Sequence, residues 1–271
     1  MPAFPADAFS GTAEYYLRYR PAYPGALIED LIARTRMEGR KRLLDLACGP
    51  GRVTLRLAPS FAEVVAVDLE PQMIAVGQTE AKRLGLTNVA WSVGRAEDVA
   101  APRESLDLIT IGDAFHRLDQ TVVIERACAW LKPHAAIAIL GSHDLLSGSE
   151  EWHAIVKAVV ERWTQRPPVY LPATQTGPEY CERLLAQAGF VDVSSFAFTA
   201  PHVWTTSDII GHLYSTSFCS KAALGANAPR FAADLEDALL RYDARGNFTE
   251  SLHFGYTFGR KASPRSPRGK R

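Results

Sequence analysis

The chain has 271 residues, enough for one α/β domain with a sizeable core and a small cover. Lysine plus arginine and aspartate plus glutamate number 30 each, and the pI is about 7.1, so no net charge would draw the protein onto nucleic acid or an anionic membrane. These numbers favour a small-molecule partner.

The four cysteines are scattered, with no CxxC pair and no neighbouring histidines at zinc-ligand spacing. We therefore expect reduced thiols and no metal ligands. No apolar run approaches the roughly 18 residues needed to cross a bilayer, and the first residues lack the regions of a signal peptide. A cytoplasmic protein with no membrane partner is the expectation. The sequence does not predict an oligomeric state.

From Lys41 to Gly141, short apolar segments alternate with longer segments of helical period, which is the pattern of a parallel sheet wrapped by helices. The short segments are nearly continuous in apolar residues, as in strands buried on both faces. The expected strands are Arg42–Ala47, Glu63–Val67, Val89–Val93, Leu106–Ile111 and Ala135–Leu140.

Beyond Leu140 the helical period returns, and aromatic-rich apolar stripes within 142–175 and 200–250 predict a mostly helical cover over the carboxyl edge of the sheet. A helix Pro178–Ala188 and two more strands, Val191–Phe198 and Ser251–Gly259, are also expected, the strands as an antiparallel edge. The chain then divides into a helical lid segment (1–40), a core (41–141), a cover with the last strands (142–260) and a disordered basic tail (261–271).

The densest motif is LLDLACGPGRVTLRLA, residues 43–58, in which a buried strand runs into a glycine-rich turn and then a helix. Gly49 and Gly51 let the backbone approach a ligand and adopt unusual dihedral angles, while the helix points its free amides at the same place. A GxG alone is weak evidence. The spacing also misses the full GxGxxG of pyrophosphate-binding enzymes.

The next expected strand ends in an acid, Asp68, about 20 residues further on, where a carboxylate can accept hydrogen bonds from a ribose diol. Asp68 can alternatively cap the following helix, but Pro71 as the first helical residue makes Glu70 the more natural cap. Leu69 would then pack against an adenine. Ribose recognition is therefore favoured.

A third strand leads into VGRAEDV, which offers Ala96 with its neighbouring amides and Glu97 or Asp98 to an adenine edge. A merely solvated acidic loop is the alternative. The loop lies where the strand tips are expected to converge, which favours binding.

In this order and spacing, DLACGPG, AVDLEP, RAEDV, LDLITIGDAFHRLD and AWLKP resemble the class I methyltransferase family over about 100 residues. The resemblance implies a Rossmann-like, doubly wound, mostly parallel seven-stranded sheet with helical lid insertions. It also implies that S-adenosylmethionine is the cofactor and S-adenosylhomocysteine the product. The fourth strand lacks the Asn/Asp-Pro-Pro-aromatic string of enzymes that methylate exocyclic amides and bases, which argues against such substrates.

By position, the resemblance assigns cofactor contacts to the glycine turn, the second-strand acid and the third-strand loop. These residues are Asp45, Ala47, Gly49, Gly51, Asp68, Leu69, Ala96 and Glu97. The string YYLRYRPAYP is similar to an entry segment that covers the cofactor in a small-molecule subgroup. Tyr15, Tyr19 and Arg20 are thus lid candidates, or they only pack the first helix.

Asp113 and His116 follow the fourth strand at the carboxyl edge, where ligands of open α/β sheets bind. Asp113 is expected to face the amino group of the cofactor's methionine part. His116 is the candidate general base or orienting group, because a histidine with a pKa near 6.5 is largely neutral at cytoplasmic pH. The alternative is that His116 only forms a pocket wall.

Trp152, Trp204 and Tyr214 are candidates for the wall of an acceptor pocket, although each can equally belong to the core of the cover. The resulting hypothesis is methyl transfer to an oxygen or nitrogen atom of a small organic acceptor. A cofactor-binding protein that catalyses a non-methylating reaction or acts as a sensor stays open. A protein or RNA methyltransferase is disfavoured by the neutral charge.

Overall fold

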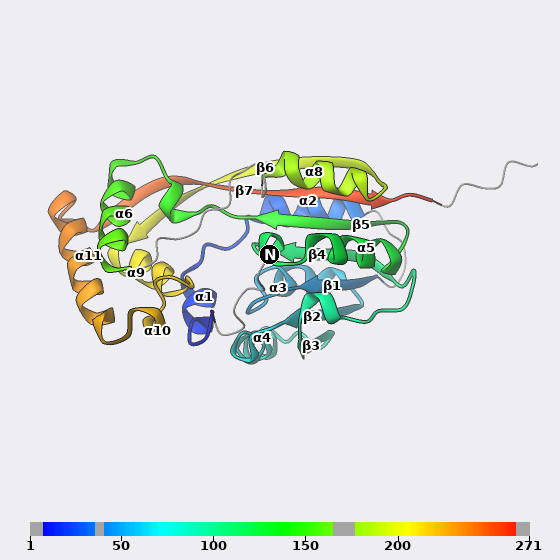
Figure 1. Cartoon of the computed structure of the whole chain (residues 1–271), viewed down its shortest axis with the longest axis horizontal. Helices are drawn as coiled ribbons and strands as arrows, with labels where there is room; N and C mark the ends of the chain where they lie inside the picture. Colours follow the sequence, from blue (N-terminus) through cyan, green and yellow to red (C-terminus); the bar gives the residue numbers. More distant parts are fainter. Residues whose placement is uncertain (1–7, 36–40, 165–176, 264–271) are drawn as a thin grey trace, which may run out of the picture.

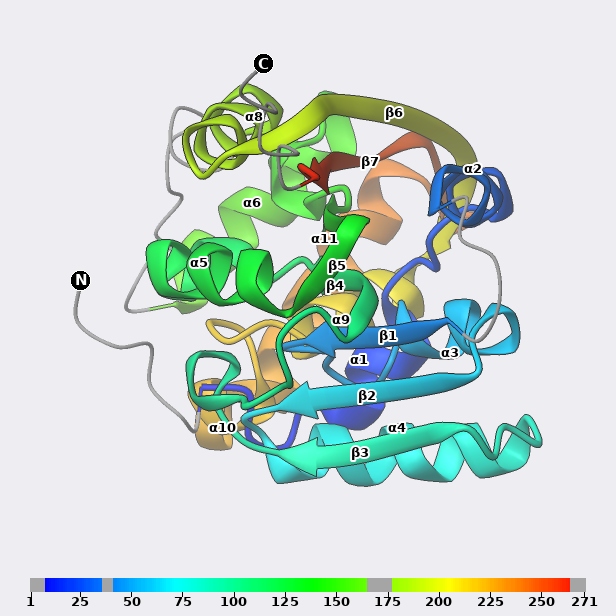
Figure 2. The ribbon, with the colours of Figure 1, turned by 90° about the vertical axis from the view of Figure 1, so that its right-hand side faces the viewer.

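The computed structural model describes residues 8–35, 41–164 and 177–263. A seven-stranded sheet forms its centre, in the order β3-β2-β1-β4-β5-β7-β6 (Figures 1 and 2). The first five strands are parallel, and β7 runs antiparallel to both of its neighbours. The strands are β1 Arg42–Leu46, β2 Glu63–Asp68, β3 Val89–Val93, β4 Leu106–Gly112, β5 Leu131–Gly141, β6 Phe190–Thr205 and β7 Asn247–Lys261. The predicted Rossmann-like α/β class and its antiparallel edge are confirmed.

Helices flank the sheet and gather at one of its ends. Those beside the sheet are α2 Gly25–Thr35, α3 Thr54–Leu57, α4 Pro71–Arg83, α5 Gln120–Trp130 and α8 Pro178–Gln187. Those at the end are α1 Ala13–Tyr19, α6 Glu151–Trp163, α9 Thr206–Tyr214, α10 Lys221–Leu224 and α11 Ala228–Tyr242. Short 3-10 helices are η1 Ala58–Ser60, η2 Ala96–Asp98, η3 Phe115–Arg117, η4 Leu145–Ser147 and η5 Gly225–Asn227.

Alternate residues of the central strands enter hydrophobic clusters on opposite faces of the sheet. Leu43 of β1 and Leu108 of β4 belong to one cluster, whereas Leu44 and Ile109 belong to the other. Since both faces are covered, β1 and β4 are mostly apolar, and their buried polar residues are Asp45, Asp107 and Thr110. This is why their positions could be predicted closely.

The last two strands are longer than predicted. Their pairing runs from Phe190 opposite Lys261 to Thr205 opposite Asn247, whereas β5 pairs with β7 only from Gly255 to Arg260. The ribbon therefore extends beyond β5, and the predicted helical region 200–250 is helical only from Thr206 to Tyr242 with short interruptions. Pro201 obscured the strand pattern; a proline is tolerated here because β6 is an edge strand.

We call α6, α9, α10 and α11 the helical module. It packs at the far end of the β6–β7 ribbon, beyond the carboxyl edge of the parallel strands (Figure 1). α1 contacts both α9 and α4, so it lies between the module and the sheet. α2 instead packs its Leu27 and Leu31 into the sheet cluster. The predicted lid segment 1–40 therefore contains one helix beside the carboxyl edge and one that belongs to the core.

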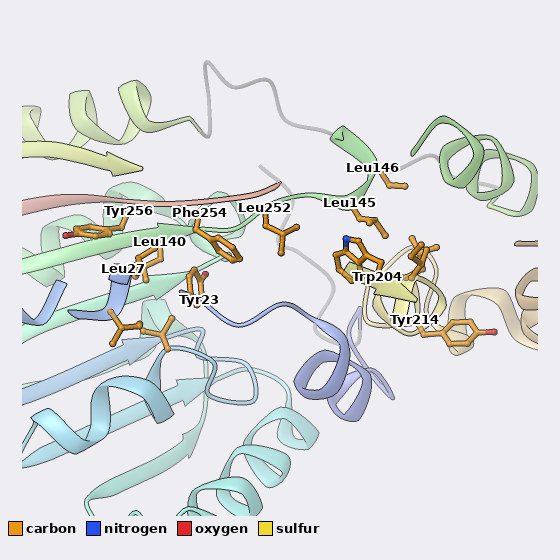
Figure 3. Packing of buried hydrophobic residues seen from close by; sticks show 14 of the residues in the cluster. Tyr23, Leu27, Leu140, Leu145, Leu146, Trp204, Tyr214, Leu252, Phe254 and Tyr256 are labelled. Carbon is orange, nitrogen blue, oxygen red and sulfur yellow. The ribbon is translucent and has the colours of Figure 1, made fainter. Parts of the chain in front are cut away.

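One hydrophobic cluster runs without a break from the sheet into the helical module (Figure 3). Leu140 and Phe254 lie at its sheet end, Leu252 in its middle and Trp204 and Tyr214 at its module end. The two parts are thus joined by apolar packing.

Of the predicted tail, residues 264–271 lie outside the described residues. Among the described helices, none is both long and apolar enough to cross a membrane.

Candidate functional site

The glycine-rich turn after β1 forms the floor of a pocket at the carboxyl edge. Ala47, Gly49 and Gly51 all have left-handed backbone, with φ of 51°, 56° and 87°. Ala47 and Gly49 line the pocket, and a Cβ atom at Gly49 would meet nothing closer than Tyr16 at 4.0 Å, so a ligand can approach the backbone there. A Cβ atom at Gly51 would lie 2.7 Å from the Trp91 ring. Gly51 is therefore required by packing and is absent from the pocket lining.

Asp45 supports this turn from inside the sheet. Its buried carboxylate accepts hydrogen bonds from the hydroxyls of Thr54 and Thr110, the latter at 2.7 Å, and so ties β1 to α3 and β4. Burial raises the pKa of Asp45 to about 6, against the lowering effect of the two hydroxyls. Asp45 lines a separate small cavity beside the glycine turn, together with Tyr23 and Arg52. The arrangement gives it a structural task beneath the turn.

Asp68 ends β2 and faces the glycine turn. Its Oδ2 accepts a hydrogen bond from the Gly49 amide at 2.7 Å, and its Oδ1 accepts one from the Glu70 amide at 2.9 Å. Burial raises the pKa of the half-buried carboxyl. The Leu69 amide is a third hydrogen-bond donor to this carboxylate. Since a carboxylate offers about four acceptor positions, about one remains for a ligand hydroxyl. Glu70, not Asp68, is the N-cap of α4, because its side chain accepts from the Gln72 amide.

The outer wall of the pocket comes from five segments of the chain. η2 contributes Ala96 and Glu97, as the sequence predicts, and Leu69 lies beside them. The Glu97 carboxylate accepts from the Asp119 amide at 3.0 Å, which fixes the loop after β3. The remaining lining residues are Phe9, Tyr16, Arg20, Asp68, Glu70, Met73, Gly94, Arg95, Gly112, Asp113, Ala114, Arg117 and Leu118.

Asp113 lies at the end of β4 with a left-handed φ of 53°, and it lines the pocket. Its carboxylate accepts four hydrogen bonds: one each from Tyr23 and Arg52, and two from the amide and hydroxyl of Ser142. Burial alone would raise the pKa of Asp113, but the Arg52 guanidinium and Ser142 hold it below its usual value. Three of these bonds reach Oδ2 and one reaches Oδ1, so an acceptor position remains on Oδ1. The expected contact with an amino group can use that position.

Arg52 is one of the residues that sequence reasoning missed, as are Tyr16 and Arg117 of the pocket lining. Arg52 directly follows the glycine turn, is buried, and donates from one terminal nitrogen to Asp113 at 2.9 Å and from the other to the Pro21 carbonyl. Its guanidinium also lies 4.8 Å from the Tyr23 ring. Arg52 therefore connects the chain before α2 to the end of β4. An arginine inside the motif GPGR was the available signal.

The N-terminal aromatic string divides between the pocket and the helical module. Tyr16 and Arg20 line the pocket, with the Arg20 guanidinium 4.3 Å above the Tyr16 ring and its Nε donating to Ser215 at 2.9 Å. Tyr15 is not in the lining; it packs on Tyr19 and Tyr214. The predicted contact of Tyr15 with the cofactor is not supported by this arrangement. Its neighbour Tyr16 has that position.

His116 lies in η3 and does not line the pocket. Its neighbour Arg117 does line it. The His116 Nε2 accepts a hydrogen bond from Arg117 Nε at 3.0 Å. Burial, together with the Arg117 charge, lowers the pKa of His116 to about 4. Such a group is a weak base whose acceptor nitrogen is already engaged. The geometry thus favours the alternative in which His116 supports the wall.

The three predicted acceptor contacts lie in the interior of the cover. Trp152 and Trp204 are almost fully buried, and the Tyr214 hydroxyl donates to the Ala228 carbonyl at 2.8 Å. None of them lines the described pocket. Since all three belong to the cluster that fills the helical module, their contribution to the structure is packing.

A parallel sheet with a glycine turn after β1, an acid at the end of β2 and a pocket at its carboxyl edge defines a nucleotide-cofactor-binding α/β protein. Residues 43–134 match the family model described as a methyltransferase domain. The match covers about a third of the chain and identifies residues 43–134 as a methyltransferase domain.

Relatives and solved structures are consistent with this match. An uncharacterized methyltransferase of Mycobacterium tuberculosis is 29% identical over 133 residues, which is 49% of this chain and 51% of that protein. The chain thus spans about half the length of that curated relative. A trans-aconitate 2-methyltransferase of Methylobacterium radiotolerans is 28% identical over 70% of this chain and 67% of its own length. A candidate type II methyltransferase structure from Anaeromyxobacter dehalogenans is similar in fold, with a TM-score of 0.62, 22% identity and coverage of 91% of this chain and 100% of that chain.

Proposed function

We propose that the protein transfers a methyl group from S-adenosylmethionine to an oxygen or nitrogen atom of a small organic acceptor. The observation that carries the proposal is the convergence of Gly49, Asp68 and Leu69 with the η2 loop on one pocket. The pocket fits the cofactor's parts: the backbone is open at Gly49, and the Asp68 carboxylate keeps about one acceptor position for a ribose hydroxyl. Ala96 and Glu97 are assigned to the adenine.

The bound cofactor supplies an electrophilic methyl group on a sulfonium, with a good leaving group. The chain's own residues then need chiefly to position the reactants and to exclude water. Phe9, Tyr16 and Met73 supply apolar surface at the pocket, and Arg20 and Arg117 supply positive charge. A neutral or anionic small molecule suits this lining. The relative named for trans-aconitate is consistent with such an acceptor.

Calorimetric titration with S-adenosylmethionine and S-adenosylhomocysteine tests the cofactor assignment. Asp68→Ala should weaken binding about 10- to 150-fold, equivalent to about 1.5–3 kcal/mol, because it removes a charged acceptor of hydrogen bonds. Asp237→Ala, on the exposed face of α11, is the matched control and should bind as the wild type does. Unchanged affinity in Asp68→Ala would contradict the ribose assignment.

Methyl transfer itself is tested with methyl-labelled cofactor and a panel of phenols, amines and carboxylates. We expect label in at least one small acceptor and none in protein or RNA. Tight cofactor binding without any transfer would instead favour a non-methylating reaction or a sensor. Tight binding of a nicotinamide dinucleotide instead of S-adenosylmethionine would overturn the assignment of this pocket to a methyltransferase cofactor.

A further inference from the structure

Outside the pocket, three metal-ligand side chains from distant parts of the chain converge. His143 follows β5, His153 lies in the first turn of α6, and Glu250 lies on β7. The ligand atoms of the three side chains all lie within 4.8 Å of one another. Both His143 Nε2 and His153 Nε2 approach the same oxygen, Glu250 Oε2, at 3.0 and 3.1 Å. Ligands of a tetrahedral zinc ion are separated by about 3.3 Å, which follows from bond lengths of about 2.0–2.1 Å.

The group is buried and held in place from outside. The side chains of His143, His153 and Glu250 are 10%, 2% and 4% exposed. The Trp204 indole donates to the other carboxylate oxygen, Oε1, which leaves Oε2 directed at the two imidazoles. The Trp152 ring stacks on His153 with the ring centres 3.6 Å apart. Such support from surrounding groups is typical of the way proteins orient metal ligands.

The hydrogen bonding within the group is incomplete. Within the described residues, His143 Nε2 has no aligned hydrogen-bond partner although it lies 3.0 Å from the carboxylate, and His153 Nδ1 has none at all. Buried polar atoms in native proteins nearly always have a partner. An ion between the imidazole nitrogens and the carboxylate would give His143 Nε2 a well-aligned partner.

We propose that His143, His153 and Glu250 bind one divalent transition-metal ion of the zinc type. Two imidazoles and one carboxylate form a donor set that suits Zn²⁺, whereas Mg²⁺ and Ca²⁺ prefer oxygen ligands alone. The ion joins the end of β5, the start of α6 and the β6–β7 ribbon. It therefore fastens the helical module to the sheet. Its ligand His143 directly follows Ser142, which donates two hydrogen bonds to Asp113 at the pocket.

The first experiment measures metal content and affinity in the full chain. Dialysed protein is titrated with Zn²⁺ and with Co²⁺, whose absorption reports tetrahedral coordination, and Mg²⁺ serves as the control ion. We expect one equivalent of Zn²⁺ or Co²⁺ to bind and no Mg²⁺. The absence of saturable Zn²⁺ binding would overturn the proposal and leave the group as a hydrogen-bonded network.

The second experiment removes one ligand at a time. Glu250→Gln keeps the size of the side chain and an oxygen that can accept from Trp204, and His143→Ala changes a loop residue; both should fold, as circular dichroism checks. Each should weaken Zn²⁺ binding at least about 100-fold, since changes even in supporting groups cost 10- to 100-fold. The exposed His134→Ala is the control for adventitious binding by histidine. Equal Zn²⁺ affinity in folded Glu250→Gln and wild type would overturn the ligand set.

A third readout separates this proposal from the proposed function. Zn²⁺ should raise the thermal unfolding temperature of the wild type, because it binds only the folded state, and should leave that of Glu250→Gln unchanged. Affinity for S-adenosylhomocysteine is measured in the same samples. Loss of cofactor binding with an intact zinc site, or the reverse, shows which of the two assignments fails.

Discussion

The carboxyl edge of the sheet and the helical module differ in how their polar groups are arranged. At the sheet edge, Asp68 contacts Gly49 and Glu70, partners within 20 residues in the sequence, and the turn that joins them follows one strand. Where β7 meets the module, Glu250 contacts His153 of α6, 97 residues away. The Asp68 contacts belong to one local motif, whereas the Glu250 contact exists only after the ribbon and α6 have packed together.

The comparison also separates two kinds of stabilisation. The sheet edge holds a buried ion pair, Arg52 with Asp113, whose side chains are 8% and 13% exposed. The module rests on apolar packing, with Phe231, Leu235 and Leu239 of α11 fully buried. Changes at the edge should therefore alter both stability and ligand binding. Changes inside the module should alter stability alone.

The largest effect is expected at the buried ion pair. Arg52→Met should lower the free energy of unfolding by about 3–5 kcal/mol, because it leaves the Asp113 carboxylate buried without its cation. Urea unfolding measures this change. Arg245→Ala, which breaks the exposed pair with Asp243, is the control and should cause no measurable change. A loss below about 1 kcal/mol in Arg52→Met would mean that water reaches Asp113.

Within the module, Leu235→Ala should lower the free energy of unfolding by about 2–5 kcal/mol, because the fully buried side chain leaves a cavity. Hydrogen exchange should rise in α6, α9 and α11 and stay unchanged in β1 and β4. Affinity for S-adenosylhomocysteine should be that of the wild type. A weaker affinity would remove the distinction between the two regions. Glu236→Ala, exposed on the same helix, is the control.

His116 should have a smaller effect, on how the free energy of unfolding depends on pH. Its pKa is about 4 in the folded protein and 6.5 ordinarily, so between these values the unfolded chain binds more protons and stability falls as the pH falls. The wild type should lose about 2–3 kcal/mol more than His116→Gln between pH 6.5 and 4.5. Asp45, with its pKa raised to about 6, opposes this trend, but it is present in both proteins and cancels.

The same variant tests catalysis. A group with a pKa of about 4 stays unprotonated from pH 6 to 8, so His116 gives the reaction rate no pH dependence in that range. We expect His116→Gln to turn over within about threefold of the wild type. A loss of about 100-fold with unchanged cofactor affinity would restore the role of base or orienting group.

Sequence reasoning succeeded where a local pattern determines the structure. The apolar strands of the sheet, the glycine turn, Asp68 and the Glu70 cap each depend on neighbours within a few residues or on burial on both faces. It could not pair Arg52 with Asp113, 61 residues away, because nothing in either segment specifies the other. The convergence of His143, His153 and Glu250 could not be predicted for the same reason, because the three residues come from distant segments.

The predicted acceptor residues show a second kind of error. Trp152, Trp204 and Tyr214 have the amphipathic character of pocket residues, and the same character suits a core in which indole nitrogens or hydroxyls find buried partners. Composition alone cannot distinguish these two environments. Their burial in one continuous cluster favours the core, because all three side chains pack among other apolar residues.

The smallest expected effect compares two adjacent tyrosines of α1, which lie about 100° apart around the helix axis, so only one of them can face the pocket. Tyr16 lines the pocket beneath the Arg20 guanidinium, whereas Tyr15 packs against Tyr19 and Tyr214. Tyr16→Ala should weaken S-adenosylhomocysteine binding about five- to tenfold, or about 1–1.4 kcal/mol, through lost contact surface and a less ordered Arg20. Tyr15→Ala should change that affinity less than about twofold while lowering the unfolding temperature, because its ring belongs to the module side of α1. The reverse ranking in calorimetry, with Tyr15→Ala the weaker binder, would show that α1 turns its other face to the cofactor.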